Sequence, residues 1–126
     1  MLNHQDLMAR GLAKLNEIDG EQGDKVKQAL ADISPDLGKY IIGFAFGEIY
    51  QRPQLDVRQR ELVTLAALAA QSGCENQLRV HIHASLNVGL TRDEIVEAFI
   101  QCIPYLGFPK VLNAVFVATE VFAAAE

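Results

Sequence analysis

The sequence predicts an all-α protein, and three observations indicate this fold class. Apolar residues recur at spacings of three and four along most of the chain, no segment alternates with the period of a strand, and capping or breaking residues separate the apolar stretches. With 126 residues, of which 50% are hydrophobic, the chain is large enough for one domain with a buried core. We expect about seven helices in a single domain, residues 1–126, with an N-terminal helical arm over about residues 1–34.

The first three helices follow from apolar stripes and the breaks between them. A stripe from Leu12 to Ile18 predicts the first helix, which a polar stretch containing two glycines ends. A short second helix stops at Pro35. This proline also suits the first turn of a third helix, because its missing N–H would have no partner there in any case. We expect the third helix to run to about Tyr50, followed by a loop at Arg52-Pro53-Gln54.

The fourth and fifth helices are marked by caps and by a glycine stop. Asp56 is a candidate N-cap with Gln59 three residues on, which is a capping-box arrangement. Because residues 62–70 contain only one polar side chain, we expect the fourth helix to be buried on all sides. The fifth helix is predicted over about Glu75 to Asn87, with Gly89 as a left-handed stop.

The last two helices complete the chain and indicate self-association. Thr91 with Glu94 forms a second capping box, and Pro104 and Pro109 are expected to bracket a turn at residues 105–108. The C-terminal helix is apolar around most of its circumference. In a chain of this size such a helix is hard to bury in a monomer, so it is either threaded through the centre of the fold or buried between subunits, the alternative we favour.

Composition and charge exclude several classes of partner. The formal net charge of −5, from 11 basic and 16 acidic residues, argues against nucleic acid or an anionic membrane as the main partner. The longest apolar runs fall far short of the roughly 18–20 residues that cross a bilayer. The N-terminus lacks a basic segment followed by an apolar one, so no signal peptide is expected. These features predict a cytoplasmic protein.

Histidine spacing argues against a metal site. His81 and His83 are two residues apart, which on a helix turns the two rings about 200° away from each other, so they cannot share an ion. We therefore expect no metal site from local sequence. His83 is predicted to lie at the surface or an interface, and His4 to be solvated.

Cys74 and His81 are candidates for a shared pocket. Seven residues make two helical turns, so the two side chains lie within about 20° of the same face and about 10 Å apart along the axis, too far to touch. A thiol at a helix start has its thiolate favoured by the helix dipole. The alternatives are a small buried thiol at Cys74 and a core histidine with one polar partner at His81.

Two acidic residues and a tyrosine are further candidates. Glu61 lies just inside the start of the apolar fourth helix, where a partly desolvated carboxylate suits proton transfer. It could equally be a first-turn acid favoured by the helix dipole or paired with Arg58 or Arg60. Glu48 has a similar setting at the end of the third helix, and Tyr105 could point into a cleft or cap a helix end. Both are candidates for contacting a substrate.

Several short motifs occur together along the chain. In order they are Gly47-Glu48-Ile49-Tyr50, Arg52-Pro53, Arg60-Glu61-Leu62, Leu78-Arg79-Val80-His81, Asn87-Val88-Gly89-Leu90-Thr91 with Glu94-Ile95, and Tyr105-Leu106-Gly107-Phe108-Pro109. In this order and spacing they resemble the carboxymuconolactone decarboxylase family over about residues 40–120, with the alkylhydroperoxidase D-like proteins as a related branch. The resemblance implies an alkylhydroperoxidase D-like helical bundle built on a helical hairpin, a homotrimer or hexamer, and active sites near subunit contacts.

The peroxidase branch of this resemblance is only partly matched. That branch uses a Cys-x-x-Cys-x-x-x-His motif, in which Cys74 matches the first cysteine and His81 the histidine, while Gln77 replaces the second cysteine. A dithiol cycle within the motif is therefore impossible. Cys102, expected in the core, could serve instead only if the fold brings it to Cys74. A thiol-dependent peroxidase using Cys74 is thus the alternative function.

Decarboxylase chemistry fits the residues better. In the reaction that the resemblance implies, a γ-carboxylated butenolide loses CO2, and the electron pair moves onto the lactone carbonyl, so no cofactor is expected. His81 is the candidate proton donor or oxyanion stabiliser, because histidine exchanges protons near neutral pH, and Glu61 would orient or reprotonate it. Arg52 and Arg58 are candidates for gripping carboxylates, whereas Arg79 points away from His81 on the same helix.

The sequence therefore favours a decarboxylase acting on a small carboxylated lactone or a related acid. A third possibility is a helical assembly protein without catalytic activity that binds a small acid. Because the family restricts the fold more than the substrate, the decisive expectation is structural. We expect the imidazole of His81 to project into an enclosed void large enough for a ligand.

Overall fold

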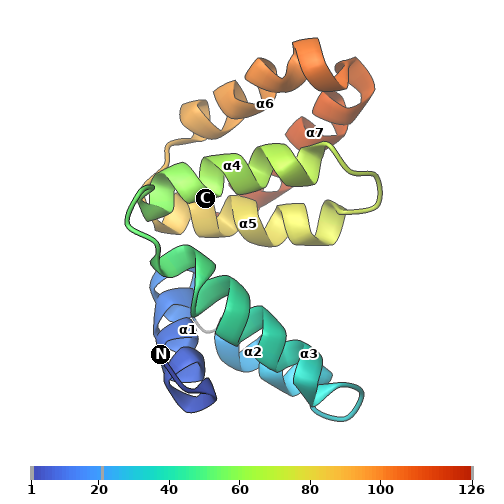
Figure 1. The fold of residues 1–126 in the computed structure, drawn as a ribbon. Helices are drawn as coiled ribbons and strands as arrows, with labels where there is room; N and C mark the ends of the chain where they lie inside the picture. The colour runs from blue at the N-terminus through green and yellow to red at the C-terminus, as the bar shows by residue number, and fades with distance from the viewer. Residues whose placement is uncertain (1, 21, 126) are drawn as a thin grey trace. The chain divides into compact units, whose positions relative to one another are not determined.

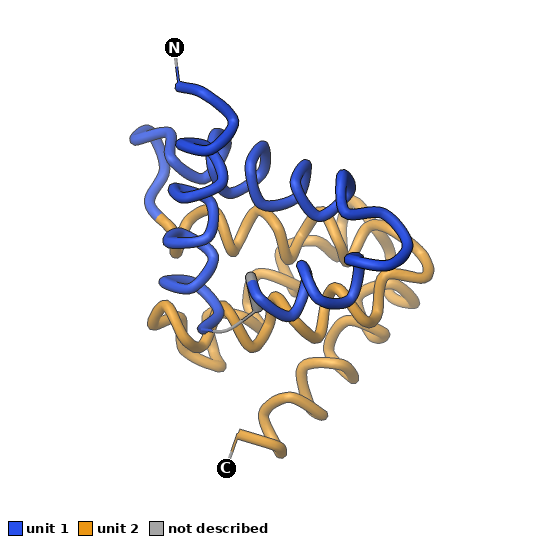
Figure 2. Tube along the Cα trace, turned by 90° about the horizontal axis from the view of Figure 1, so that it is seen from below, with its two compact units in different colours: residues 1–56 blue, residues 57–126 orange. Residues whose placement is uncertain are grey.

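The computed structural model describes residues 2–20 and 22–125, and it confirms the predicted all-α class. Helices contain most of these residues, and no strand occurs among them. The chain divides into two compact units, residues 1–56 and 57–126 (Figure 2). Whether the chain acts as the single domain expected from its length stays a prediction. No helix within the described ranges has the length and apolar character needed to span a bilayer.

Unit 1 is an assembly of helices of different lengths and types (Figure 1). It comprises α1 (His4–Asp19), α2 (Gln22–Leu30), α3 (Pro35–Lys39), the π-helix η1 (Tyr40–Phe46) and the 3-10 helix η2 (Ile49–Gln51). Asn3 and Asp6 form a capping box at the start of α1. Ser34 caps α3, and Pro35 occupies its first turn as predicted.

The third predicted helix is not a continuous α-helix to Tyr50, which corrects the expectation from sequence. After Lys39 the backbone widens into a π-helix, in which the N–H of Gly47 donates to the carbonyl of Ile42 five residues earlier at 2.9 Å. The N–H of Glu48 then donates to the carbonyl of Phe44 at 3.0 Å, which restores the α pattern. Apolar periodicity cannot reveal this change, because the two helix types differ by less than one residue per turn.

Two glycines explain how η1 packs on α1. A Cβ added at Gly11 would collide with the carbonyl oxygen of Ile42, and one added at Gly47 would collide with the carbonyl oxygen of Leu7. The main chains of the two helices are therefore in direct contact, and only glycine fits at these two positions.

Unit 2 contains four α-helices in residues 57–125 (Figure 1). They are α4 (Val57–Ala69), α5 (Glu75–Asn87), α6 (Arg92–Leu106) and α7 (Phe108–Ala124). Consecutive helices α4 and α5 lie side by side as a helical hairpin, and α7 packs against both α5 and α6. A single hydrophobic cluster fills the space between the four helices, with Leu65, Ile82, Ile95 and Phe99 fully buried at its centre.

Two expectations for α4 and α6 are wrong. The α4 helix is buried on one face only, through Glu61, Leu65 and Ala69, while Val63 on another side is 59% exposed. The α6 helix does not stop at Pro104 but continues to Leu106. A proline removes one N–H donor but has a helical φ, so it can be accommodated near the end of a helix. The helix ends instead at Gly107, whose φ is 86°.

Candidate functional site

A buried carboxylate from α4 meets a histidine from α5 in unit 2. Oε2 of Glu61 lies 2.9 Å from Nδ1 of His81. The side chain of Glu61 is fully buried, whereas that of His81 is 21% exposed. A carboxylate that is fully removed from water is rare unless it is paired, so this contact is the most unusual polar feature of the unit.

Helix geometry explains why these two side chains meet. Glu61 lies one turn before Leu65 on the buried face of α4, so it points in the same direction as that core residue. Ile82, next to His81 on α5, is fully buried in the same hydrophobic cluster. The packing of the two helices therefore brings His81 to the boundary of the core, where one ring nitrogen contacts Glu61 and part of the ring contacts solvent.

The backbone around His81 is also held. The hydroxyl of Ser85, which is fully buried, donates to the carbonyl oxygen of His81 at 2.7 Å. This bond within α5 satisfies a buried hydroxyl by the common contact to the carbonyl four residues earlier. Together with Glu61 it restrains both the ring and the main chain of His81, and an oriented imidazole of this kind can accept and deliver a proton.

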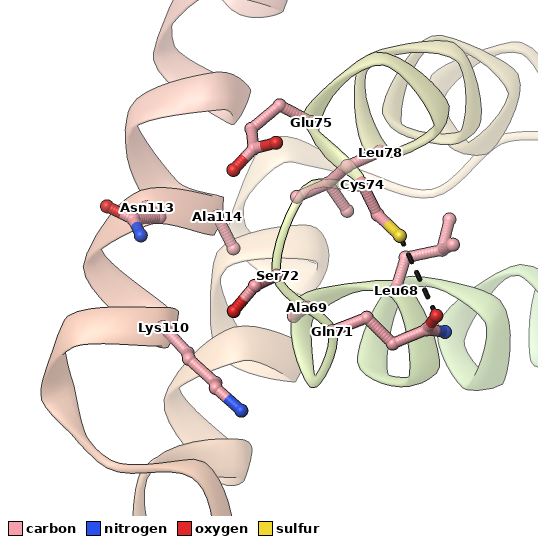
Figure 3. A pocket seen from close by; sticks show the side chains of 10 residues that line it. All are labelled: Leu68, Ala69, Gln71, Ser72, Cys74, Glu75, Leu78, Lys110, Asn113 and Ala114. Atoms are coloured by element: carbon pink, nitrogen blue, oxygen red, sulfur yellow. Dashed lines mark hydrogen bonds between the residues drawn. The ribbon is translucent and has the colours of Figure 1, made fainter.

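Cys74 lies at the start of α5, in a different small hollow. It occupies the N-cap position, and its thiol donates to Oε1 of Gln71 at 3.7 Å. This hollow has a volume of about 50 Å³. Figure 3 shows Lys110 and Asn113 projecting from α7 on one side of it, with Ser72 and Cys74 on the other. The lining residues do not include His81.

A second hollow in unit 2 is an open apolar groove between α4 and α6, of about 490 Å³. Leu62, Val63, Ala98 and Cys102 contribute to its lining, and His81 does not. Because neither of these two hollows is lined by His81, the enclosed void expected beside this residue stays a prediction.

Two arginines of unit 2, Arg58 and Arg79, form ion pairs at the surface. Arg58 donates to both carboxylate oxygens of Glu94, at 3.1 and 3.2 Å. Arg79 contacts Glu120 at 3.0 Å and Asn76 at 3.0 Å. A substrate carboxylate would therefore have to replace Glu94 to bind Arg58.

Glu94 is held ionised by its surroundings. The predicted capping box is confirmed, since Glu94 accepts from the N–H of Thr91 at 2.9 Å and the Thr91 hydroxyl accepts from the N–H of Glu94 at 3.0 Å. The backbone N–H of Thr91 is the largest cause that lowers the pKa of the Glu94 carboxyl below 4.5, and the positive charge of Arg58 acts in the same direction.

The remaining candidates lie apart from these groups along the chain. Arg52 and Glu48 are exposed residues of unit 1, where Glu48 lines a hollow of about 140 Å³ together with His4 and Lys39. Tyr105 is 79% exposed near the end of α6, not in a turn. The exposed positions of His4 and His83 agree with their predicted surface locations.

The two cysteines form no disulfide with each other. Cys74 and Cys102 are both free thiols. Cys102 is buried as expected, its thiol donates to the carbonyl of Ala98 at 3.3 Å, and burial raises its pKa. Across the residues described, no group of three or more histidine, cysteine, aspartate or glutamate side chains is arranged to hold a metal ion.

Sequence reasoning missed two local polar contacts and one that depends on how helices dock. Gln71 as acceptor for Cys74 and Ser85 as donor to the His81 carbonyl were not identified. For Ser85 the sequence contains a signal, because a serine in a helix commonly donates its hydroxyl to the carbonyl four residues earlier, which here is that of His81. The Arg58–Glu94 pair joins residues 36 positions apart and has no local signal.

The geometry defines a class of small helical protein that pairs a buried carboxylate with a histidine on a helical hairpin. The chain belongs to the carboxymuconolactone decarboxylase family, whose model matches residues 35–120. This confirms the family that the motifs resemble.

Individual relatives agree with this assignment. Over 122 residues the chain is 37% identical to the 4-carboxymuconolactone decarboxylase of Acinetobacter baylyi, covering 96% of this chain and 90% of that protein. It is 31% identical over 120 residues to a nitrosuccinic acid decarboxylase of Metarhizium robertsii, covering 93% and 82% of the two chains. An uncharacterised 15.0 kDa protein of Paracoccus denitrificans is 30% identical over 97 residues, covering 76% and 72%. Similarity to two decarboxylases supports carboxy-lyase activity.

Proposed function

We propose that this protein is a carboxy-lyase that removes CO2 from 4-carboxymuconolactone, or from a closely similar carboxylated lactone, in the breakdown of aromatic compounds. The observation that carries the proposal is the 2.9 Å contact between Glu61 and His81, which provides an oriented proton carrier at the edge of the core. The similarity to a 4-carboxymuconolactone decarboxylase over nearly the whole chain supports this choice of substrate.

The proposed reaction needs one proton and an electron sink. The bond between the γ-carbon and its carboxylate breaks, CO2 leaves, and the electron pair moves through the ring double bond onto the lactone carbonyl oxygen. His81 then delivers a proton to a ring carbon, which gives the enol-lactone, and His81 recovers a proton from solvent. The substrate thus exchanges CO2 for H⁺, and no electrons are gained or lost overall.

Glu61 has two tasks in this proposal. Its carboxylate accepts from Nδ1 when that nitrogen carries a proton, which orients the ring and leaves Nε2 to face the substrate. Its negative charge also stabilises the imidazolium form that precedes proton delivery. Because the carboxylate is fully buried, little water competes for this interaction.

The same chemistry suits a second class of acid. The relative from Metarhizium robertsii is named for nitrosuccinic acid, and loss of CO2 beside a nitro group also leaves an anion that the neighbouring group can hold. The common requirement is a carboxylate on carbon next to an electron-withdrawing group. Nitrosuccinic acid is therefore the second compound to test.

Further residues are assigned by proposal only. Arg52 and Arg58 are proposed to bind substrate carboxylates, with Arg58 leaving Glu94, since a surface ion pair costs little to open. Glu48, Tyr105 and Cys74 stay candidates for contacting the substrate.

The surroundings of the reaction are also proposals. We expect the protein to act as a homo-oligomer, a trimer or a hexamer, in the cytoplasm, without nucleic acid or membrane as a partner. That the reaction needs no cofactor remains a prediction as well.

The test compares two histidines of α5. His81→Ala is expected to lower decarboxylation of the lactone by about 10²- to 10⁴-fold, the range usually lost with a general acid or base. His83→Ala is the matched control, because His83 is exposed on the other side of the same helix and should keep wild-type turnover. Unchanged turnover in His81→Ala, with circular dichroism showing an intact fold, would overturn the assigned role.

A thiol peroxidase remains the alternative. The position of Cys74 at the start of α5, half-buried and beside a small polar hollow, is the observation in its favour. Consumption of a hydroperoxide that disappears in Cys74→Ser, in a protein without lactone turnover, would favour this function. Saturable binding of a small acid without any turnover would favour the assembly protein.

A further inference from the structure

Unit 1 contains a hollow between the start of α1 and the segment from Lys39 to Glu48. Its volume is about 140 Å³, and all of its lining residues belong to unit 1. A cavity of about 150 Å³ in a protein holds one molecule of benzene. The hollow therefore has room for a single six-membered ring. We call it the unit 1 hollow.

Gly43 keeps the unit 1 hollow open, although packing does not require a glycine there. A Cβ added at Gly43 would meet Sδ of Met8 at 3.5 Å and Cβ of Leu7 at 3.9 Å, which are ordinary van der Waals distances. At Gly11 and Gly47, by contrast, an added Cβ would collide with main-chain carbonyl oxygens. Gly43 lies inside η1 without a positive φ, where alanine favours a helix more than glycine does. The space beside Gly43 has no role in packing α1 on η1 and is available to a ligand.

Two opposite charges line the unit 1 hollow, one before η1 and one after it. Lys39 contacts Asp36 at 3.8 Å, and this exposed ion pair contributes little, so the ammonium group is available to a ligand. His4 adds a ring nitrogen that donates a hydrogen bond in either tautomer. Glu48 brings a carboxylate, and within the described part of the chain no lysine, arginine or histidine forms an ion pair with it. A fitting ligand carries an anion and a hydrogen-bond donor.

Two exposed aromatic rings belong to the same lining. Tyr40 and Phe44 are 67% and 57% exposed and lie four residues apart on η1, which is about one turn. An aromatic ligand packs against such rings by offset stacking or edge-to-face contact, which stabilises it beyond the burial of apolar area. An aliphatic ligand of the same size lacks this contribution. The lining therefore favours a planar aromatic ring.

We propose that the unit 1 hollow binds a single-ring aromatic acid that carries a hydroxyl group. The carboxylate of the acid contacts Lys39 and His4, and its hydroxyl donates to the carboxylate of Glu48. Its ring occupies the space beside Gly43. The proposal does not rest on the decarboxylase chemistry of unit 2, so binding and turnover can fail independently. If it holds, Glu48 contacts this acid and not the lactone.

The test is binding of 4-hydroxybenzoate to the full chain, measured by isothermal titration calorimetry. We expect a dissociation constant of about 1 mM or lower, as is usual for a ligand of about ten non-hydrogen atoms. Gly43→Ala should raise this constant at least about tenfold, because the added methyl group takes the space of the ring. Gly38→Ala is the matched control, since its Cβ contacts Leu30 at 3.7 Å and Gly38 does not line the hollow. Its dissociation constant should stay within about twofold of wild type.

Two further variants assign the polar groups of the ligand. Lys39→Met should remove the advantage of 4-hydroxybenzoate over phenol, because phenol lacks the carboxylate that Lys39 contacts. Glu48→Ala should remove the advantage of 4-hydroxybenzoate over benzoate, because benzoate lacks the hydroxyl. Circular dichroism checks that each variant is folded.

Several results would overturn the proposal. They are no binding at about 10 mM ligand, equal weakening by Gly38→Ala and Gly43→Ala, and equal affinity for 4-hydroxycyclohexanecarboxylate, which has no aromatic ring. Binding that is lost in His81→Ala and kept in Gly43→Ala would assign the acid to unit 2 and would contradict the proposal as well.

Discussion

Replacing Glu61 with glutamine tests whether its charge, rather than its shape, serves His81. Glutamine keeps the size of the side chain and its capacity for a hydrogen bond but removes the negative charge. With Oε2 and Nδ1 at 2.9 Å, the centres of the two charges are about 4 Å apart when His81 is protonated. At an effective dielectric constant of about 20, the attraction between them is about 4 kcal/mol.

Loss of this attraction in Glu61→Gln should lower the rate of decarboxylation. If it is lost from the protonated state that precedes the transition state, kcat for the lactone falls about 10³-fold, since each 1.36 kcal/mol corresponds to a factor of about ten. The assay is CO2 release from 4-carboxymuconolactone at saturating substrate. Glu97→Gln, an exposed charge change on α6, is the control and should keep the wild-type rate.

A double variant separates a cooperating pair from two independent residues. If Glu61 acts through His81, then Glu61→Gln combined with His81→Ala should be no more than about threefold slower than His81→Ala alone. Two results would show that the contact between the two side chains is structural only. One is a double variant whose loss of kcat equals the product of the two single losses, and the other is a kcat in Glu61→Gln within about threefold of wild type.

Two predictions concern stability. Phe99→Ala should lower the free energy of unfolding by about 3–5 kcal/mol in a urea titration, because Phe99 is fully buried in the core of unit 2, whereas Ile100→Ala, at a 45% exposed neighbour, should cost under about 1.5 kcal/mol. Similar losses in the two variants would contradict the packing described. Glu94→Gln should lower Tm at about pH 7 but much less at about pH 3. The pKa of Glu94 is lowered in the folded protein, so its charge stabilises the fold above 4.5 and this contribution is lost as the pH falls through the folded-state value. An equal difference in Tm at both pH values would refute this.

Features set by neighbouring residues were predictable from the sequence. The capping box of Thr91 and Glu94 involves groups three residues apart, so it forms wherever the helix starts, and the structure has it. Pro35 in the first turn of α3 follows from the same local logic. The expectation that Glu61 orients His81 came from the chemistry required by the family resemblance, and the structure brings the two side chains into contact.

Features set by packing were not predictable. The exposure of Val63 depends on how much of α4 its neighbours cover, which the apolar pattern of one helix does not contain. Pro104 predicts the start of a turn, but a proline near a helix end needs only to give up one hydrogen bond, so α6 continues past it. The Arg58–Glu94 pair arises when α4 docks against α6, so neither residue carries a local sign of it.

The glycine contact in unit 1 determines how that unit tolerates change. Most helix pairs are separated by side chains, which can adopt new rotamers when one of them is enlarged. Gly11 and Gly47 leave no such adjustable layer between α1 and η1, because an added methyl group would strike a carbonyl oxygen of the opposing main chain. Accommodating a single carbon atom there requires moving an entire helix. Substitution at these two sites is therefore restricted by the rigidity of the backbone and not by the loss of any favourable interaction.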